Sequence, residues 1–199
     1  EIWISYRGIK TSLNDGMSEK AQATSKQIEQ SIADLERQIS WATRAYSNTV
    51  EMRRADYAQL LRQVPQVSQL SLLDPRGREQ LRLSRRTVNL GSNVDFSRDV
   101  SFTEAAARGA GYAPPYFRGE HPYMSIALSH SDSNVTVAEI DLEFLSEFLG
   151  EAQVGKVAFA YVVDDKGQVL ASSAKGPEVG KSLTALPQVA AAIKPGRAL

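Results

Sequence analysis

The chain has 199 residues, 42% of them hydrophobic, and its 23 basic side chains balance its 23 acidic ones. The hydrophobic share is sufficient for a folded core, which excludes extensive disorder, and the neutral balance argues against a nucleic-acid partner, whose binding relies on cationic contacts with phosphate. The lack of cysteine excludes disulfides, thiol nucleophiles and cysteine-ligated zinc.

The first residues, Glu1 to Arg7, are aromatic and apolar and then basic, and they do not start with methionine. Such a stretch is typical either of the outer end of a membrane helix, with Trp3 and Tyr6 at the interface, or of an ordinary helix start. The sequence has no full transmembrane run and no signal peptide. We therefore expect the chain to be a piece of a longer protein.

A long helix is predicted over residues 17–64, which contain no proline or glycine, although the polar residues around Asn48 allow a break. At 1.5 Å per residue it would be roughly 50 Å long or longer, so it needs a sheet or a second copy of itself as partner. The coiled-coil spacing at its start predicts a homodimer through this helix. Its stripe consists of Ile28, Ile32, Leu35, Ile39, Ala42, Tyr46, Val50, Arg53, Tyr57, Leu60 and Val64.

After Pro65 the pattern changes to period two, which is typical of strands. A hairpin is expected first, with a turn of proline-second and glycine-fourth type between its strands, followed by a helix that a glycine ends. Three strands and a short helix ended by Gly150 come next. The predicted ranges are strands 67–73 and 80–84, helix 99–108, strands 112–117, 123–129 and 135–141, and helix 142–149.

The first hairpin then recurs at an offset of 90 residues, with strands at 156–163 and 168–172 and a helix at 187–193. Asp74 corresponds to Asp164 and Gly77 to Gly167. An apolar strand followed by Asp-x-x-Gly and another strand is common in hairpins, so chance similarity is the alternative to a true repeat.

This order of elements resembles the double Cache sensor region of bacterial receptors. The segments that carry the likeness are Asp95–Arg98 through Phe102–Ala105, Tyr112–Phe117, Met124–Leu128, Val137–Leu142, Gly155–Ser173, Val179–Leu183 and Leu186–Val189. The resemblance implies an α+β fold, in which a long N-terminal helix packs on a PAS-like antiparallel sheet and a second PAS-like subdomain begins. The implied domains are the helix at 1–64, a membrane-distal sensor subdomain at 65–150 and the start of a membrane-proximal one at 151–199.

In this family the full-length protein crosses the bacterial inner membrane twice, through flanking segments absent here, and the sensor region lies in the periplasm. The resemblance implies a ligand-sensing domain with a cytoplasmic output, which we expect to be a two-component histidine kinase. A nucleotide cyclase (adenylate, guanylate or diguanylate) or a chemoreceptor is the alternative. The region itself is expected to have no catalytic activity.

A pocket for a small polar ligand is expected between the helix at 99–108 and the strands that follow it. Tyrosine offers a flat apolar face and one hydroxyl, and arginine can hold a carboxylate in a bidentate manner. A half-buried strand position for each tyrosine and a solvated turn for Arg118 are the plainer alternatives. The candidate residues are Phe102, Tyr112, Tyr116, Arg118, Tyr123 and Ser125.

Asp99 is a further candidate, as a selector of ligand charge. Amino-acid-binding members of the family carry an Arg-x-Trp-Tyr pattern where this sequence reads Asp99-Val100-Ser101-Phe102. A carboxylate in place of arginine reverses the local charge and favours an amine, or a ligand with donors and no carboxylate. The alternative is a helix N-cap, a position that favours aspartate.

Catalytic motifs are absent from the sequence, which has neither a nucleophile elbow, nor a phosphate-binding loop, nor a His-Glu-x-x-His zinc motif. The two histidines, His121 and His130, lie nine residues apart across a predicted strand, too far to share a metal. We therefore expect no catalytic residue, metal site or cofactor. Two hypotheses remain: a ligand-binding sensor, or an interaction and dimerisation module without a small ligand.

Overall fold

The computed structural model describes residues 10–11, 18–43, 49–85, 87–90, 92, 94–151 and 160–193. Its contacts divide the chain into two compact units, each with a sheet of its own. The large-sheet unit consists of residues 33–113 and 123–141, and the small-sheet unit of residues 1–32, 114–122 and 142–199. This is an α+β fold with an N-terminal helix followed by antiparallel sheet, so the predicted fold class is confirmed.

The N-terminal helical region consists of two helices, α1 (Ser18–Thr43) and α2 (Val50–Gln63), and not of one continuous helix. Thr49 is the N-cap of α2: its backbone is extended, and its side chain accepts a hydrogen bond from the amide of Met52. A threonine hydroxyl satisfies amides that a helix start leaves without partners. The break that the polar residues near Asn48 allowed is therefore present, and the single uninterrupted helix was wrong.

The apolar stripe on these helices is buried within one copy of the chain. Ile28, Ile32, Leu35 and Ile39 are each at most 4% exposed, and Tyr57 and Leu60 of α2 are also buried. Tyr46 lies outside the described residues. The stripe whose spacing suggested a coiled coil thus packs against the protein's own residues.

The large sheet is antiparallel, in the order β4-β3-β2-β8-β7-β5, with β6 also paired to β7. The expected strand at 112–117 is interrupted at residues 113–115, which include two prolines that have no amide to donate. The short edge strand β4 was not predicted. The bounds are β2 Val67–Leu73, β3 Glu79–Ser84, β4 Val88–Leu90, β5 Ala110–Tyr112, β6 Tyr116–Arg118, β7 His121–Ser129 and β8 Val135–Asp141.

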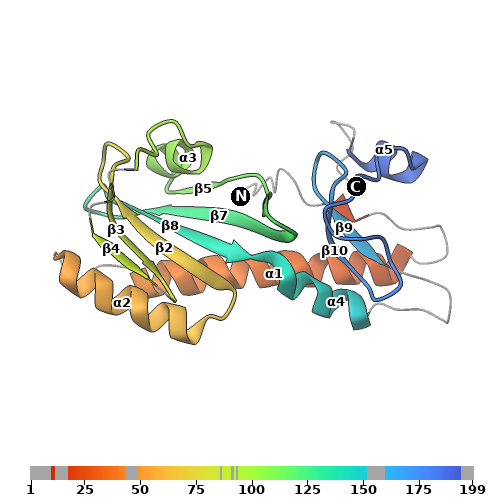
Figure 1. The fold of residues 1–199 in the computed structure, drawn as a ribbon, viewed down its shortest axis with the longest axis horizontal. Coiled ribbons are helices and arrows are strands. Elements are labelled where there is room, and N and C mark those ends of the chain that lie inside the picture. Colours follow the sequence, from red (N-terminus) through yellow and green to blue (C-terminus); the bar gives the residue numbers. More distant parts are fainter. Residues whose placement is uncertain are drawn as a thin grey trace. The chain divides into compact units, whose positions relative to one another are not determined.

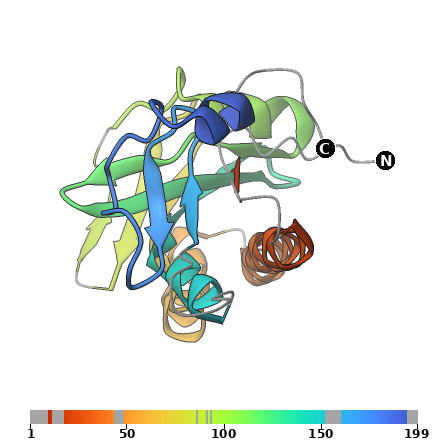
Figure 2. The same cartoon turned by 90° about the vertical axis from the view of Figure 1, so that its right-hand side faces the viewer.

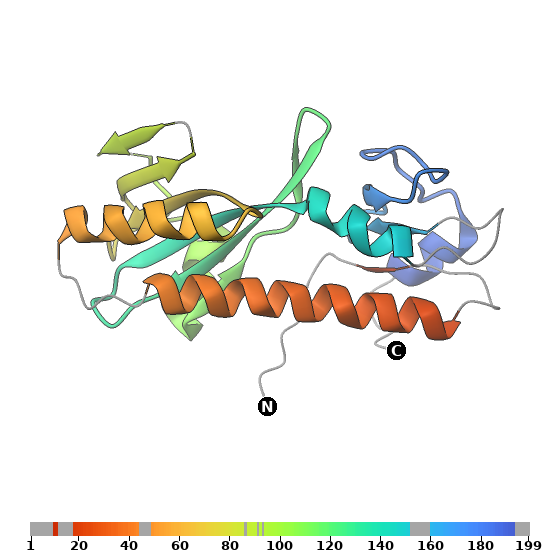
Figure 3. The same cartoon turned by 90° about the horizontal axis from the view of Figure 1, so that it is seen from below.

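Helices cover both faces of the large sheet (Figure 1). Helix α3 (Val100–Arg108) lies on one face, where Phe102 and Ala105 form an apolar cluster with Leu73, Ala127, Val135 and Val137. Helix α2 and the last part of α1 run side by side along the opposite face (Figure 3). We call these the α3 face and the α1 face.

The small sheet has the order β1-β9-β10 (Lys10–Thr11, Tyr161–Val163 and Val169–Ser172), and α4 and α5 lie on opposite sides of β9 and β10 (Figure 2). The predicted helix after β8 is a short 3-10 turn (Leu142–Phe144) followed by α4 (Leu145–Glu151), which continues past Gly150. Helix α5 spans Pro187–Ile193, as predicted. The first part of the strand expected at 156–163 lies outside the described residues.

The two Asp-x-x-Gly turns have the same hydrogen bonds. In the first, the Asp74 carboxylate accepts from the amides of Arg76 and Arg78, and the Gly77 amide donates to the Asp74 carbonyl. The second repeats each of these bonds with Asp164 in place of Asp74. Gly77 and Gly167 have φ of 79° and 74°, a left-handed backbone that favours glycine.

Candidate functional site

Two of the predicted site residues have structural roles at the start of α3. The Asp99 carboxylate caps the helix by accepting hydrogen bonds from the amides of Ser101 and Phe102 and from the Ser101 hydroxyl. The Phe102 ring is 6% exposed and belongs to the apolar cluster under α3. The observed contacts of Asp99 are therefore those of a helix N-cap.

Tyr112 lies on the other face of the sheet from the one that α3 covers. It pairs with Ile126, whereas the neighbouring Gly111 pairs with Ala127 of the apolar cluster on the α3 face. Because successive strand residues alternate between faces, the Tyr112 side chain is directed to the α1 face. There its hydroxyl donates a hydrogen bond to Glu36 of α1 at 2.5 Å.

The remaining predicted residues fall in two different units. Tyr116 and Arg118 belong to β6 and the small-sheet unit, with Arg118 exposed. Tyr123 and Ser125 belong to β7 and the large-sheet unit, and both are half-buried. Tyr123 lies four residues and Ser125 two residues before Ala127 of the apolar cluster, so the side chains of all three share the α3 face.

The strand register gathers polar residues on this face beyond the apolar cluster. In β8, Asp141 pairs with Tyr123 and Glu139 with Ser125, while in β2 Gln69 pairs with Glu139. Directly paired residues have side chains on the same face of a sheet. One step further along, Val137 pairs with Ser71, which pairs with Arg82 of β3. We call these seven residues the polar end of the α3 face: Gln69, Ser71, Arg82, Tyr123, Ser125, Glu139 and Asp141.

Glu139 and Asp141 are candidate site residues that were not predicted from the sequence. Glu139 is only 6% exposed, and one of its carboxylate oxygens accepts a hydrogen bond from the Ser68 hydroxyl at 2.7 Å. Ser68 occupies an irregularity in the pairing of β2 with β8, between Val67 and Gln69. The available signal was a pair of carboxylates two residues apart in a mostly apolar strand, since acidic residues are seldom buried unless they are paired.

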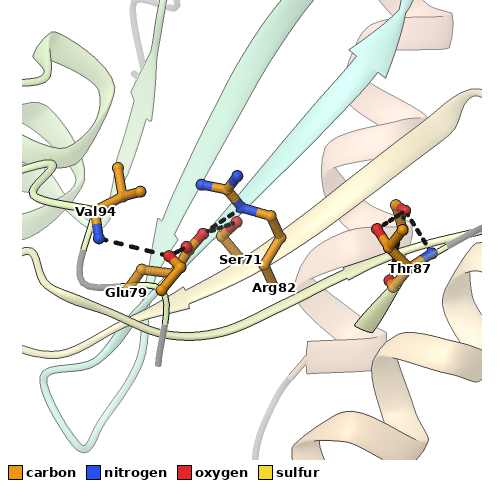
Figure 4. A network of polar contacts seen from close by, with 7 residues as sticks. Ser71, Glu79, Arg82, Thr87 and Val94 are labelled. Carbon is orange, nitrogen blue, oxygen red and sulfur yellow. Dashed lines mark hydrogen bonds and ion pairs between the residues drawn. The ribbon is translucent and has the colours of Figure 1, made fainter. Parts of the chain in front are cut away.

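A second buried carboxylate, Glu79, holds Arg82 in place (Figure 4). One oxygen of Glu79 accepts hydrogen bonds from the Ser71 hydroxyl and from Arg82 Nε, each at 2.7 Å, and the other accepts from the Ser92 hydroxyl. The Glu79 side chain is fully buried, whereas the Arg82 side chain is 26% exposed. The ion pair thus anchors the inner part of Arg82 and leaves its outer part near solvent.

A further polar network joins α2 to the turn between β7 and β8. Arg53, the charged member of the helical stripe, is 3% exposed and donates to Asp132 at 2.5 Å. The hydroxyl of Thr136 contacts both the Tyr57 hydroxyl and His130 Nε2 at 2.6 Å. Burial raises the pKa of Tyr57 well above its ordinary value. These contacts give the polar side chains of this turn a structural role.

His130 is expected to make the large-sheet unit less stable in acid. Burial, together with the positive charge of Arg53, lowers the pKa of its imidazole from 6.5 to about 4. Between these values the unfolded chain binds a proton that the folded chain does not, so stability falls as the pH falls from about 6.5 to about 4. Allowing for partial exposure, we expect a loss on the order of 2 kcal/mol in the free energy of unfolding.

Urea unfolding of the wild type and of His130→Gln at pH 7 and pH 4 checks this expectation. The variant should lose less stability between the two pH values than the wild type, whereas His121→Gln, a change at an exposed histidine, should leave that loss in place. The pKa of Asp132 is lowered from 3.8, so its titration falls below this window. Equal losses in the wild type and His130→Gln would contradict the assignment.

Within the described ranges, no group of three or more histidine or acidic side chains is placed to hold a metal ion. His121 contacts Glu143, whereas His130 contacts Thr136. The helices of the described part of the chain are also too short or too polar to cross a membrane.

No protein-family model and no curated protein matches the sequence. Several solved structures match the fold. The extracellular domain of mmHK1S-Z2, described as a histidine kinase, aligns over 89% of this chain and 80% of its own at 13% identity and a TM-score of 0.66. The ligand-binding domain of the Pseudomonas aeruginosa chemoreceptor PctB, in complex with L-Gln, aligns over 87% of this chain and 74% of its own at 18% identity and a TM-score of 0.63.

The ligand-binding domain of the Pseudomonas aeruginosa chemoreceptor PctC, in complex with GABA, aligns over 86% of this chain and 80% of its own. Its identity is 16% and its TM-score 0.61. Identities this low establish similarity of fold. The chain therefore has the fold of the sensor domains of bacterial receptors, as its resemblance to the Cache-type family predicted.

Proposed function

We propose that the chain is the extracytoplasmic sensor region of a bacterial transmembrane receptor and that it binds a small, amine-bearing molecule. The observation that supports this most is the pair of carboxylates, Glu139 and Asp141, on the α3 face beside Tyr123 and Ser125. Two acidic groups on one face produce a potential that attracts a cation, and the tyrosine ring offers a flat surface and a hydroxyl to a small ligand.

Similar folds support a ligand of this kind. GABA and L-Gln, the ligands of the PctC and PctB domains, both carry an amine. The departure at Asp99–Phe102 from the amino-acid-binding pattern points to a different means of recognition, and Glu139 supplies a negative group within the large-sheet unit. Of the residues predicted as ligand contacts, Tyr123 and Ser125 remain in the proposed site, while Tyr116 and Arg118 stay candidates from β6.

The receptor that we propose carries a histidine kinase as its cytoplasmic output, with a nucleotide cyclase or a chemoreceptor as the alternative. It lies in the bacterial inner membrane, with the region described here in the periplasm. A homodimer through α1 is part of the proposal. Because Ile28 and Ile32 are covered by the chain itself, the contact would use the opposite side of α1, where Trp41 is 77% exposed.

Signalling in this proposal is a shift between two arrangements of the helices or of the membrane-proximal subdomain expected at residues 151–199. A ligand moves such an equilibrium only by binding one arrangement more tightly. A difference of about 1.4 kcal/mol in binding free energy changes the equilibrium constant tenfold. The second candidate function is an interaction and dimerisation module without a small ligand. The exposed Trp41 on α1 favours it, since a large aromatic side chain in solvent is typical of contact surfaces.

The ligand proposal is tested by thermal denaturation of the wild type and its variants with a panel of acids, amines and sugars. Glu139→Gln keeps the side chain's size and its capacity to bond Ser68, yet it removes the charge. We expect amines to stabilise the wild type and to bind Glu139→Gln at least about tenfold more weakly, because a charge-assisted hydrogen bond is lost. Tyr123→Ala should weaken binding in the same direction.

Glu29→Gln, a neutralisation at an exposed position of α1, is the matched control and should bind like the wild type. Undiminished amine binding by both Glu139→Gln and Tyr123→Ala would show that the site is elsewhere. Failure of the whole panel to stabilise the wild type would favour the ligand-free interaction module.

A further inference from the structure

We propose that the polar end of the α3 face selects a ligand with an ammonium and a carboxylate several carbons apart, an ω-amino acid rather than an α-amino acid. Glu139 would receive the ammonium and Arg82 the carboxylate. This inference rests on the proposed function, because it names the ligand class of the same site. It adds Arg82, which neither the sequence patterns nor the comparisons assign to a ligand.

Arg82 has the geometry of a carboxylate receptor. Its Nε donates to Glu79, and this buried ion pair fixes the plane of the guanidinium. Among the described residues, Glu79 is its one hydrogen-bond acceptor, so the two outer nitrogens, Nη1 and Nη2, are left to solvent or to a ligand. Two parallel N–H groups on a fixed guanidinium match the two oxygens of a carboxylate.

The register sets a wide separation between the two charged residues. Arg82 pairs with Ser71, Ser71 pairs with Val137, and Glu139 lies two residues beyond Val137 in β8. Two strand spacings of about 4.8 Å and two residues at about 3.3 Å each place the Cα atoms of Arg82 and Glu139 roughly 12 Å apart. A ligand that reaches both residues must therefore be extended.

Each of the two side chains has a hydrogen-bond partner on the side away from the other. Arg82 is bonded to Glu79, which pairs with Leu73 and so lies towards the apolar cluster. Glu139 is bonded to Ser68, on the side away from that cluster. In an α-amino acid the ammonium and the carboxylate share one carbon, so they cannot contact both groups at once. A chain of several methylenes between them can.

The residues between the two charges suit such a ligand. Gln69 and Ser71 of β2 lie on the same face between β8 and β3, and Gln69 is half-buried. Ser71 is small, and its hydroxyl is already bonded to Glu79. Since Ser71 is only 2% exposed, a methylene chain that crosses β2 would lie over the half-buried Gln69, whose amide can bond either end.

The test uses a series of compounds on the purified chain, with affinities measured by isothermal titration calorimetry. GABA carries both charged ends, n-butylamine only the ammonium, and butyrate only the carboxylate. We expect GABA and 5-aminovalerate to bind the wild type at least about tenfold more tightly than n-butylamine, butyrate or L-alanine.

The variants separate the two ends of the site. Arg82→Gln should bind GABA only as well as it binds n-butylamine, while its n-butylamine affinity stays that of the wild type. Glu139→Gln should weaken the binding of both compounds. Arg54→Gln, at an exposed arginine of α2, should change neither affinity. Because Glu79 is buried, circular dichroism must show that Arg82→Gln is folded; Arg82→Lys, which keeps the charge but loses the paired N–H groups, serves in its place if it is not.

The outcomes distinguish this inference from the function on which it rests. If GABA and n-butylamine bind the wild type equally, or if the folded Arg82 variant keeps full GABA affinity, Arg82 is not the carboxylate receptor and the amine site stands. Tighter binding of L-alanine than of GABA overturns the spacing argument. If none of the five compounds binds the wild type, both proposals fall.

Discussion

Gly111→Ala is expected to lower the free energy of unfolding of the large-sheet unit by about 3 kcal/mol, although it adds a single methyl group. Gly111 lies in β5 directly beneath α3. A Cβ at this position would lie 2.7 Å from the amide nitrogen of Ala105 and closer still to the carbonyl oxygen of Ser101. Both atoms belong to the backbone, so no side-chain rotation relieves the clash and the whole helix must move.

Gly109→Ala is the matched control, and urea unfolding is the measurement. Gly109 ends α3 with φ of 92°, and a Cβ there would have nothing within 4 Å. Replacing it with alanine should lower the free energy of unfolding only by the strain of a left-handed backbone, about 1–2 kcal/mol. An effect of Gly111→Ala no larger than that of Gly109→Ala would mean that α3 does not lie this close to β5.

Asp132→Asn is expected to destabilise the same unit by about 3 kcal/mol, because it leaves the Arg53 guanidinium buried without its counter-charge. Asparagine keeps the size of the side chain and its capacity to accept the Asn134 amide, so the turn itself is preserved. Arg53→Met should cost less, about 1 kcal/mol, because the Asp132 side chain is 35% exposed and water can solvate it when the arginine is gone.

The double variant Arg53→Met with Asp132→Asn separates the ion pair from the other contacts of the two residues. Its loss of stability in urea unfolding should be close to that of Arg53→Met alone, which gives a coupling energy of about 3 kcal/mol. Simple additivity of the two single changes would show that Arg53 and Asp132 do not stabilise one another.

Local signals were sufficient for most of the secondary structure. Period-two alternation and a turn with glycine at its fourth position predicted β2 and the turn after it, and the strand at 135–141 has the predicted bounds. The errors lie where local patterns are weak. A short edge strand such as β4 has no alternation to detect, and the two prolines at 114–115 divide a stretch whose aromatic composition suggested a single strand.

The proposed site was harder to predict, because its residues come from four strands that only the register aligns. Tyrosine at 112 and at 123 gave the same signal in the sequence, yet pairing with Ile126 places Tyr112 on the α1 face and pairing with Asp141 leaves Tyr123 on the α3 face. Arg82 appeared as one polar residue in an alternating strand. Its ion pair with Glu79 depends on packing, which periodicity does not reveal.

The amino-acid sequence by itself determined the α+β class, the helical stripe and the repeated Asp-x-x-Gly turns, because each follows from the conformational preferences and polarity of residues close together in the chain. Only the tertiary structure decided that the stripe from Ile28 to Ile39 is buried within one copy of the chain, that Asp99 caps a helix, and that Glu139 and Arg82 share a face. These depend on which strands pair and in what register, and contacts between residues far apart in the chain set that register.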